Sequence, residues 1–274
     1  MKIGVTLRNM GIQSTPEMMK SCAECAEQLG FESIWVTDHI AIPPDDAEGS
    51  GGRYTDPLTT LAWIAGFTTT LNLGVGVLIL PYRPALPTAK QIATIQELSN
   101  DRLLLGAGVG WMEPEFRALG IDRRQRGKIT DNTLAFFKDY FDNEVVTEHG
   151  QPLIVNPRPP MPETYIGGSA PHALQRALKF GHGWMPMARN VDKLAEGIKQ
   201  FSQMAEAAGT LRGPVTVMTG LPLDESGKAR EMITAFSALE IERLVCSIQY
   251  NTEDDYRQAL TKLASIVSWD QGVI

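Results

Sequence analysis

The sequence has few cysteines, no excess of positive charge and no long apolar run, and each of these absences argues against a class of proteins. It has only 3 cysteines in 274 residues, its net charge is −7, and no apolar run reaches the length of a membrane span. The acidic balance argues against nucleic acid as a main partner, because binding to phosphates requires clustered Lys and Arg. The first residues, Met1 to Leu7, have the pattern of a strand and lack the regions of a signal peptide. We therefore expect a cytoplasmic protein without membrane or nucleic-acid partners.

The cysteines themselves do not indicate redox or metal chemistry. Cys22 and Cys25 form a C-x-x-C spacing, but they share an apolar helical stripe with Met18 and Leu29. Cys246 lies in another apolar run. All three are expected to pack in the core.

Several catalytic and cofactor motifs are also missing. The glycines of Gly106–Gly110 resemble a dinucleotide fingerprint, but the third glycine and the ribose-binding acid are absent. There is no Gly-x-Ser-x-Gly nucleophile elbow. The four histidines fall in separate contexts, which does not fit a metal site. They are His39, His149, His172 and His182.

Apolar, β-branched runs predict eight strands that alternate with helix-like segments. The strands are expected at residues 3–7, 33–36, 73–78, 103–107, 164–167, 183–186, 215–219 and 244–249. A capping box from Ser14 to Glu17 predicts the start of the first helix. Eight such units predict an α/β protein with a single (β/α)8 TIM barrel, formed as one domain by residues 1–274.

One connection is longer than the others. After the fourth strand the chain passes a predicted helix at 131–141 and two short β-like runs at 145–147 and 153–155. His149 and Gly150 lie between the two runs, which predicts a hairpin inserted between strands four and five. A proline-rich stretch at 157–162 then gives a stiff connector.

The second strand ends in an acid and a histidine side by side, Asp38 and His39. Barrel enzymes build their sites at the carboxyl ends of their strands, and histidine exchanges protons near neutrality because its unperturbed pKa is about 6.5. On its own the pair has a simpler interpretation, in which Asp38 caps the next segment and His39 is a hydrogen-bonded rim residue.

Glycines mark two further strand ends. Gly74 and Gly76 inside the third strand indicate a bulge or the close approach of a flat ligand. Gly167–Ser169 follows the fifth strand and precedes a helix, which fits either an anion site or a simple glycine turn with Ser169 as N-cap. The basic run at 123–128 fits a solvated helix start, with binding of an anionic cofactor tail as the alternative.

Taken in order, eight segments resemble one known family. They are Gly30–His39, Asp56–Leu58, Leu73–Val77, Lys90–Thr94, Arg102–Trp111, Gly127–Lys128, Ile166–Ser169 and Gly181–Trp184. This series is similar to the bacterial luciferase-like monooxygenase superfamily. The resemblance runs from Met1 to about Pro186, and the last third matches only in its strand and helix pattern. The compact chain and the Asp-His ending of strand two resemble the branch that uses a 5-deazaflavin coenzyme.

The resemblance implies roles for particular residues. His39 would be the catalytic residue, giving or taking a proton or placing the substrate, and Asp38 would contact the coenzyme ring. A non-prolyl cis peptide at Gly76–Val77 would back the ring. The strand-four residue Gly108 would also be at the cofactor site. Gly167, Gly168 and Ser169 would hold the coenzyme phosphate.

The sequence also departs from the deazaflavin-dependent sugar-phosphate dehydrogenases, because Trp111 stands where they have an acid after the strand-four glycines. Large apolar residues near the predicted strand mouths indicate an apolar or planar substrate, although core packing is the simpler interpretation for most of them. These residues are Met10, Trp63, Trp111, Met112, Met185 and Met187.

Three functions fit these observations. The first is an oxidoreductase that uses coenzyme F420 (8-hydroxy-5-deazaflavin) to move a hydride to or from a small organic substrate. The second is a two-component monooxygenase that uses FMN, and the third is a barrel that binds a flavin without turnover. The resemblance and the inserted segment also imply a homodimer.

Overall fold

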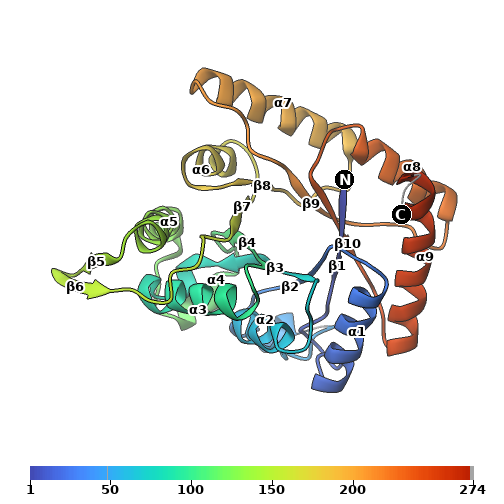
Figure 1. The fold of residues 1–274 in the computed structure, drawn as a ribbon, viewed down its shortest axis with the longest axis horizontal. Helices are drawn as coiled ribbons and strands as arrows, with labels where there is room; N and C mark the ends of the chain where they lie inside the picture. The colour runs from blue at the N-terminus through green and yellow to red at the C-terminus, as the bar shows by residue number, and fades with distance from the viewer. Residues whose placement is uncertain (48, 272–274) are drawn as a thin grey trace.

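The computed structural model describes residues 1–47 and 49–271, and its centre is a barrel of eight parallel strands (Figure 1). The strands are β1 (Lys2–Thr6), β2 (Ser33–Val36), β3 (Asn72–Ile79), β4 (Leu103–Gly108), β7 (Glu163–Gly167), β8 (Gly183–Met185), β9 (Thr216–Gly220) and β10 (Arg243–Ser247). They are hydrogen-bonded in the order β8-β7-β4-β3-β2-β1-β10-β9. The remaining gap is closed by bridges from Trp184 to Val215 and from Met187 to Met218, so the sheet returns on itself as a barrel.

The prediction of eight strands is confirmed. The largest shift is at the last strand, which was expected to end at Gln249 and ends at Ser247. The strands were recognisable because all or most of their residues are buried, as parallel strands covered on both faces must be.

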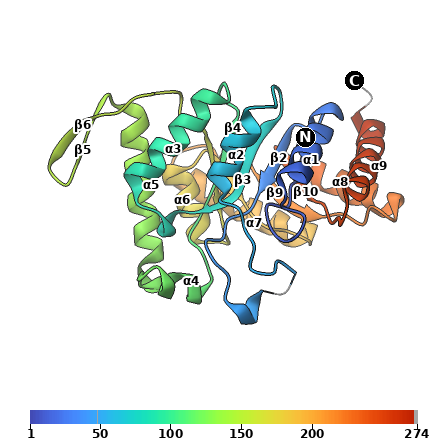
Figure 2. The same cartoon turned by 90° about the horizontal axis from the view of Figure 1, so that it is seen from below.

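Helices cover the outside of the barrel (Figures 1 and 2). They are α1 (Pro16–Gln28), α2 (Pro57–Ala65), α3 (Ala85–Leu98), α4 (Glu113–Ala118), α5 (Arg126–Asp142), α6 (His172–Phe180), α7 (Val191–Ala207), α8 (Ser226–Ser237) and α9 (Glu253–Gln271). In the part of the chain that the structure describes, no helix combines the length and the apolar character needed to cross a membrane.

The inserted hairpin is also present. Strands β5 (Val145–Glu148) and β6 (Gln151–Ile154) pair antiparallel between the fourth and fifth barrel strands. His149 and Gly150 form its turn with positive φ angles of 50° and 79°, as a tight two-residue hairpin requires. Figure 2 shows the hairpin projecting from the barrel beyond α5.

The first helix begins one residue later than its predicted cap. Thr15 is the N-cap of α1, and its side chain accepts a hydrogen bond from the Met18 amide. Ser14 donates its hydroxyl hydrogen to the Gly11 carbonyl instead, so the predicted capping box from Ser14 to Glu17 is wrong. Cys22 is buried in the core as expected, and its burial raises the pKa of its thiol to about 12.

Side chains fill the barrel interior beneath the strand mouths. Six buried residues form a cluster there, and Val77 packs against it. They are Trp35, Leu104, Tyr165, Met185, Met218 and Val245. Two of these six, Met185 and Met218, reach up to the ligand face, so this cluster forms the floor of the site described next.

Candidate active site

His39 lies just past the end of β2, where the chain leaves the barrel. Its side chain is 14% exposed and stands between two aromatic rings. The ring centroid of His39 lies 5.0 Å from that of Tyr54 and 6.1 Å from that of Trp111, both in edge-on arrangements. Trp111 itself is largely exposed, so the surroundings of His39 are apolar and open on one side.

A buried acid contacts His39 from a different element. Glu115, on α4, has its Oε2 atom 2.9 Å from the Nδ1 atom of the imidazole. The same carboxylate accepts hydrogen bonds from the amides of Ile40 and Ala41, at 2.6 and 3.1 Å, and from the Tyr82 hydroxyl at 2.9 Å. Burial, together with this neighbouring carboxylate, raises the pKa of Tyr82, so its hydroxyl is a stable donor.

Asp38, the neighbour of His39, points to another partner. Arg83 donates two hydrogen bonds to its carboxylate, at 2.6 and 2.8 Å, and the Ile79 amide donates a third at 2.8 Å. Burial raises the pKa of Asp38, and the hydrogen bonds and charge of Arg83 oppose that rise. Arg83 also reaches Asp56 at 3.0 Å, so the pair ties the ends of β2 and β3 to the start of α2.

The backbone of β3 forms a bare platform at the strand mouth. The pairing between β3 and β4 shifts register between Val75 and Leu78, and the Gly76–Val77 peptide bond is cis, as expected. A Cβ atom on Gly76 would lie 2.7 Å from the Met218 Cε atom and 2.9 Å from that of Met185. A side chain at this position would displace the ends of these two methionines, which glycine lets lie close to the strand.

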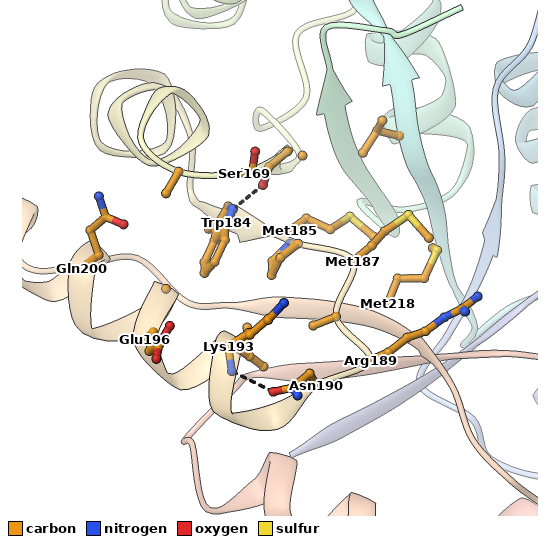
Figure 3. Close-up of a pocket in the computed structure, with 18 of the residues that line it drawn as sticks. Ser169, Trp184, Met185, Met187, Arg189, Asn190, Lys193, Glu196, Gln200 and Met218 are labelled. Carbon is orange, nitrogen blue, oxygen red and sulfur yellow. Dashed lines mark hydrogen bonds between the residues drawn. The ribbon is translucent and has the colours of Figure 1, made fainter.

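A cavity of about 820 Å³ opens on this platform. One end is formed by Gly76 and Val77, and the wall continues through the glycine turn after β7 to the side chains of α7. Figure 3 shows Met185, Met187 and Met218 gathered on one side of the cavity, while Lys193 and Glu196 lie along α7. The volume exceeds that of a single tricyclic ring, so it can hold a ring and a second small molecule.

A second cavity of about 420 Å³ shares the segment Gly167–Ala170 with the first. Arg124, Arg126 and Arg176 line it, beside the start of α6. Gly168 has a φ of +118°, a conformation that side chains disfavour. Three guanidinium groups and the amides of a helix start make this cavity suited to an anion.

The predicted site residues therefore divide into two groups. Gly76, Val77, Gly167, Gly168 and Ser169 all line the larger cavity. Asp38, His39 and Gly108 line neither of the two cavities: Asp38 is bound to Arg83, His39 contacts Glu115, and Gly108 lies directly against the Val77 side chain. A direct contact of these three residues with a coenzyme or substrate remains a prediction.

Three contributors were missed by the sequence interpretation: Glu115, Arg83 and Arg176. A signal existed only for Glu115, because helical spacing places it on one face with Met112, Phe116 and Leu119. An acid on such an apolar face is either buried with a hydrogen-bond partner, or the helix has been assigned wrongly.

The apolar residues expected at the strand mouths lie in different parts of the structure. Met185 and Met187 line the larger cavity, and Trp111 stands beside His39. Trp63 does not belong to this region, because it lies on α2 and packs on Phe67. Met112 is buried as the N-cap of α4.

The architecture is that of a (β/α)8 barrel whose ligand face, at the carboxyl ends of the strands, carries a histidine–glutamate pair and two joined cavities. A profile of the luciferase-like monooxygenase family matches residues 1–243, and the chain belongs to this family. It is therefore an enzyme of the luciferase-like class.

Proteins that the chain resembles in sequence or in fold include F420-dependent dehydrogenases and a monooxygenase. The chain is 28% identical over 225 residues to the F420-dependent hydroxymycolic acid dehydrogenase of Mycobacterium tuberculosis, covering 78% of this chain and 57% of that one. Its fold matches the monooxygenase RslO1 of Streptomyces bottropensis with a TM-score of 0.83, at 17% identity and covering 98% and 99% of the two chains. It also matches an F420-dependent secondary alcohol dehydrogenase with a TM-score of 0.75, at 15% identity and covering 96% and 99%.

Proposed function

We propose that the protein is an oxidoreductase that transfers a hydride between coenzyme F420 and a small organic substrate. One observation carries the proposal: a flat backbone platform at Gly76–Val77 and an arginine-lined anion cavity are joined through the glycine turn 167–170. A coenzyme with a planar ring and a phosphate-bearing tail fits this arrangement. The F420-dependent dehydrogenases among its relatives and structural neighbours support the choice of a deazaflavin.

In this proposal the bound coenzyme supplies the hydride chemistry, and the protein supplies orientation and a proton. Gly76 and Val77 would lie against the coenzyme ring, and Met185 and Met218 would line the same cavity around it. When the substrate is an alcohol, neutral His39 takes the hydroxyl proton as the hydride leaves the adjacent carbon. In the opposite direction protonated His39 returns that proton to the carbonyl oxygen.

The surroundings of His39 favour an apolar or planar substrate. Tyr54 and Trp111 flank the imidazole, and Ile40, the next residue in the chain, is exposed. Aromatic and aliphatic walls with one proton-handling group are typical of sites that bind small apolar molecules. We therefore propose an apolar alcohol, ketone or aromatic compound as the substrate class.

Binding measurements with two cofactors test the proposal. Titration of the purified protein with F420, followed by fluorescence or calorimetry, should give tight binding, and FMN should bind more weakly. Tight binding of FMN alone would favour the two-component monooxygenase.

A matched pair of variants tests turnover. We expect His39→Ala to lose turnover with coenzyme binding retained, whereas His149→Ala, on the exposed turn of the hairpin, should leave both unchanged. If His39→Ala kept every activity of the wild type, the protein would be better described as a flavin-binding barrel.

The homodimer implied by the resemblance is part of the same proposal, and light scattering measures it directly.

A further inference from the structure

We propose that Glu115 is a positioning residue that fixes the tautomer of His39, with the hydrogen on Nδ1 and with Nε2 directed to the substrate. The inference rests on the proposed function in one respect, that His39 exchanges a proton with the substrate. Its structural content is independent of which cofactor binds.

One carboxylate oxygen of Glu115 faces one ring nitrogen of His39. Glu115 Oε2 lies 2.9 Å from His39 Nδ1, and the side chain of Glu115 is only 1% exposed. Water therefore does not compete for this contact. Within the described part of the chain, Nε2 has no hydrogen-bond partner, so it is the ring nitrogen left for chemistry.

The other contacts of Glu115 determine which way the hydrogen points. Ile40 and Ala41 present backbone amides, which can only donate, to Oε1. The Tyr82 hydroxyl lies 2.9 Å from Oε2 and, among the described residues, has no other acceptor. With three donors already directed at it, the carboxylate is suited to act as an acceptor towards His39 as well, so Nδ1 must donate.

This arrangement gives the imidazole the form that a proton acceptor needs. A hydrogen bond from one ring nitrogen to a carboxylate selects the tautomer and also stabilises the imidazolium that forms when the other nitrogen takes a proton. Glu115 does both without contacting the substrate. It also holds the amides of Ile40 and Ala41, so the loop that follows His39 cannot turn away without breaking the same carboxylate contacts.

A conservative variant and a control on the same helix test the role. Glu115→Gln keeps the shape but removes the charge, and Glu113→Gln changes an exposed acid two residues away, which pairs with Arg123 at 3.5 Å. In ¹⁵N-labelled protein, imidazole chemical shifts report which nitrogen carries hydrogen, and the His39 signals are assigned by their loss in His39→Gln. We expect the Nδ1–H form in the wild type and in Glu113→Gln, and a mixture of tautomers in Glu115→Gln.

Turnover provides the second readout. Glu115→Gln should lower kcat by about 100-fold, at the lower end of what general acid–base catalysis contributes, with KM changed little. Tyr82→Phe, which removes one of the donors to Glu115, should give a smaller loss of kcat and a partial change in tautomer. This milder variant and the wild-type spectrum keep the test valid if Glu115→Gln does not fold.

The outcomes separate this inference from the proposed function. An Nε2–H tautomer in the wild type, or the wild-type tautomer unchanged in Glu115→Gln, would overturn the role of Glu115. Absence of turnover with F420, with the Nδ1–H form present and dependent on Glu115, would contradict the proposed function and leave the positioning role standing.

Discussion

The indole N–H of Trp184 donates a hydrogen bond of 2.9 Å to the carbonyl oxygen of Gly168. Trp184 belongs to β8 and Gly168 to the turn after β7, so the bond links two neighbouring strand mouths. Gly168 lines both cavities, and its carbonyl orientation is coupled to the amide that follows it. The tryptophan therefore holds the turn on which the proposed phosphate site is built.

Replacement of Trp184 by Phe should weaken coenzyme binding. The phenyl ring can retain the packing against Phe201 but cannot donate to Gly168. We expect a stability loss of about 1 kcal/mol from the missing hydrogen bond and a loss of coenzyme affinity of about 5-fold. Thermal melts and fluorescence titration measure the two effects. Trp63→Phe, on the outer helix α2, is the control and should change affinity little; equal effects in both variants would count against the role of the bond.

The Asp38–Arg83 ion pair should stabilise the fold only while both partners are present. Arg83→Met leaves the Asp38 carboxylate buried without its two strongest donors. Breaking such a buried pair costs about 3 to 5 kcal/mol, whereas removing both charges is often close to neutral. In urea unfolding we therefore expect the double variant Asp38→Asn/Arg83→Met to be more stable than Arg83→Met alone. A double variant as unstable as the sum of the two single variants would show that the groups are not coupled.

The strands and the cofactor turn were predictable from sequence because their signals are local. Buried parallel strands are short apolar runs, and a glycine turn before a helix is visible in a few residues, as at Gly167 and Gly168. The hairpin turn at His149 and Gly150 was recognisable for the same reason. The first helix cap was wrong by one residue, because Ser14 and Thr15 can both cap and only the Gly11 carbonyl decides between them.

The histidine–glutamate pair could not be predicted in this way. His39 and Glu115 are separated by 76 positions, and they meet only because α4 turns back over the mouths of β2 and β3. The direction of a six-residue helix after a glycine-rich strand end depends on its packing, here of Phe116 against Tyr82. The partner of Asp38 was missed for a similar reason, since nothing in the sequence around Arg83 distinguishes it from a surface arginine.

Glu27 should make the stability of the protein depend on pH. Burial alone would raise the pKa of its carboxyl, but hydrogen bonds from the amides of Thr70, Thr69 and Leu71 lower it below its ordinary value. A lowered folded-state pKa means that the stabilisation is complete at neutral pH and is lost as pH falls through the folded pKa, below the ordinary glutamate value of about 4.3.

The variant Glu27→Gln isolates this effect. At pH 7 it should lower the free energy of unfolding by about 1 to 2 kcal/mol, the range for hydrogen bonds to a charged and partly exposed acceptor. The difference from the wild type should shrink in urea unfolding at pH below about 4. Glu24→Gln, on the same helix with a weak surface ion pair, should show neither effect. A difference that stayed constant with pH would rule out the carboxylate charge as its source.

Arg126 should contribute most of the anion affinity in the arginine-lined cavity. The other two arginines there already have partners, since Arg124 pairs with Asp122 at 3.0 Å and Arg176 with Asp131 at 2.6 Å. Arg126 donates only to the Arg123 carbonyl, and no acid in the described part of the chain pairs with it. Its charge is therefore available to a phosphate, and Arg126→Gln should weaken F420 binding by about 10-fold or more, as expected for a hydrogen bond to a charged group.

Binding of the phosphate-free deazaflavin chromophore should be unchanged, and the salt dependence of F420 binding should decrease, because one screened charge pair is lost. Arg117→Gln, on the exposed side of α4, is the matched control. Equal losses for F420 and the phosphate-free chromophore would place the phosphate outside this cavity, and would leave the arginines with a structural role at the start of α5 and α6.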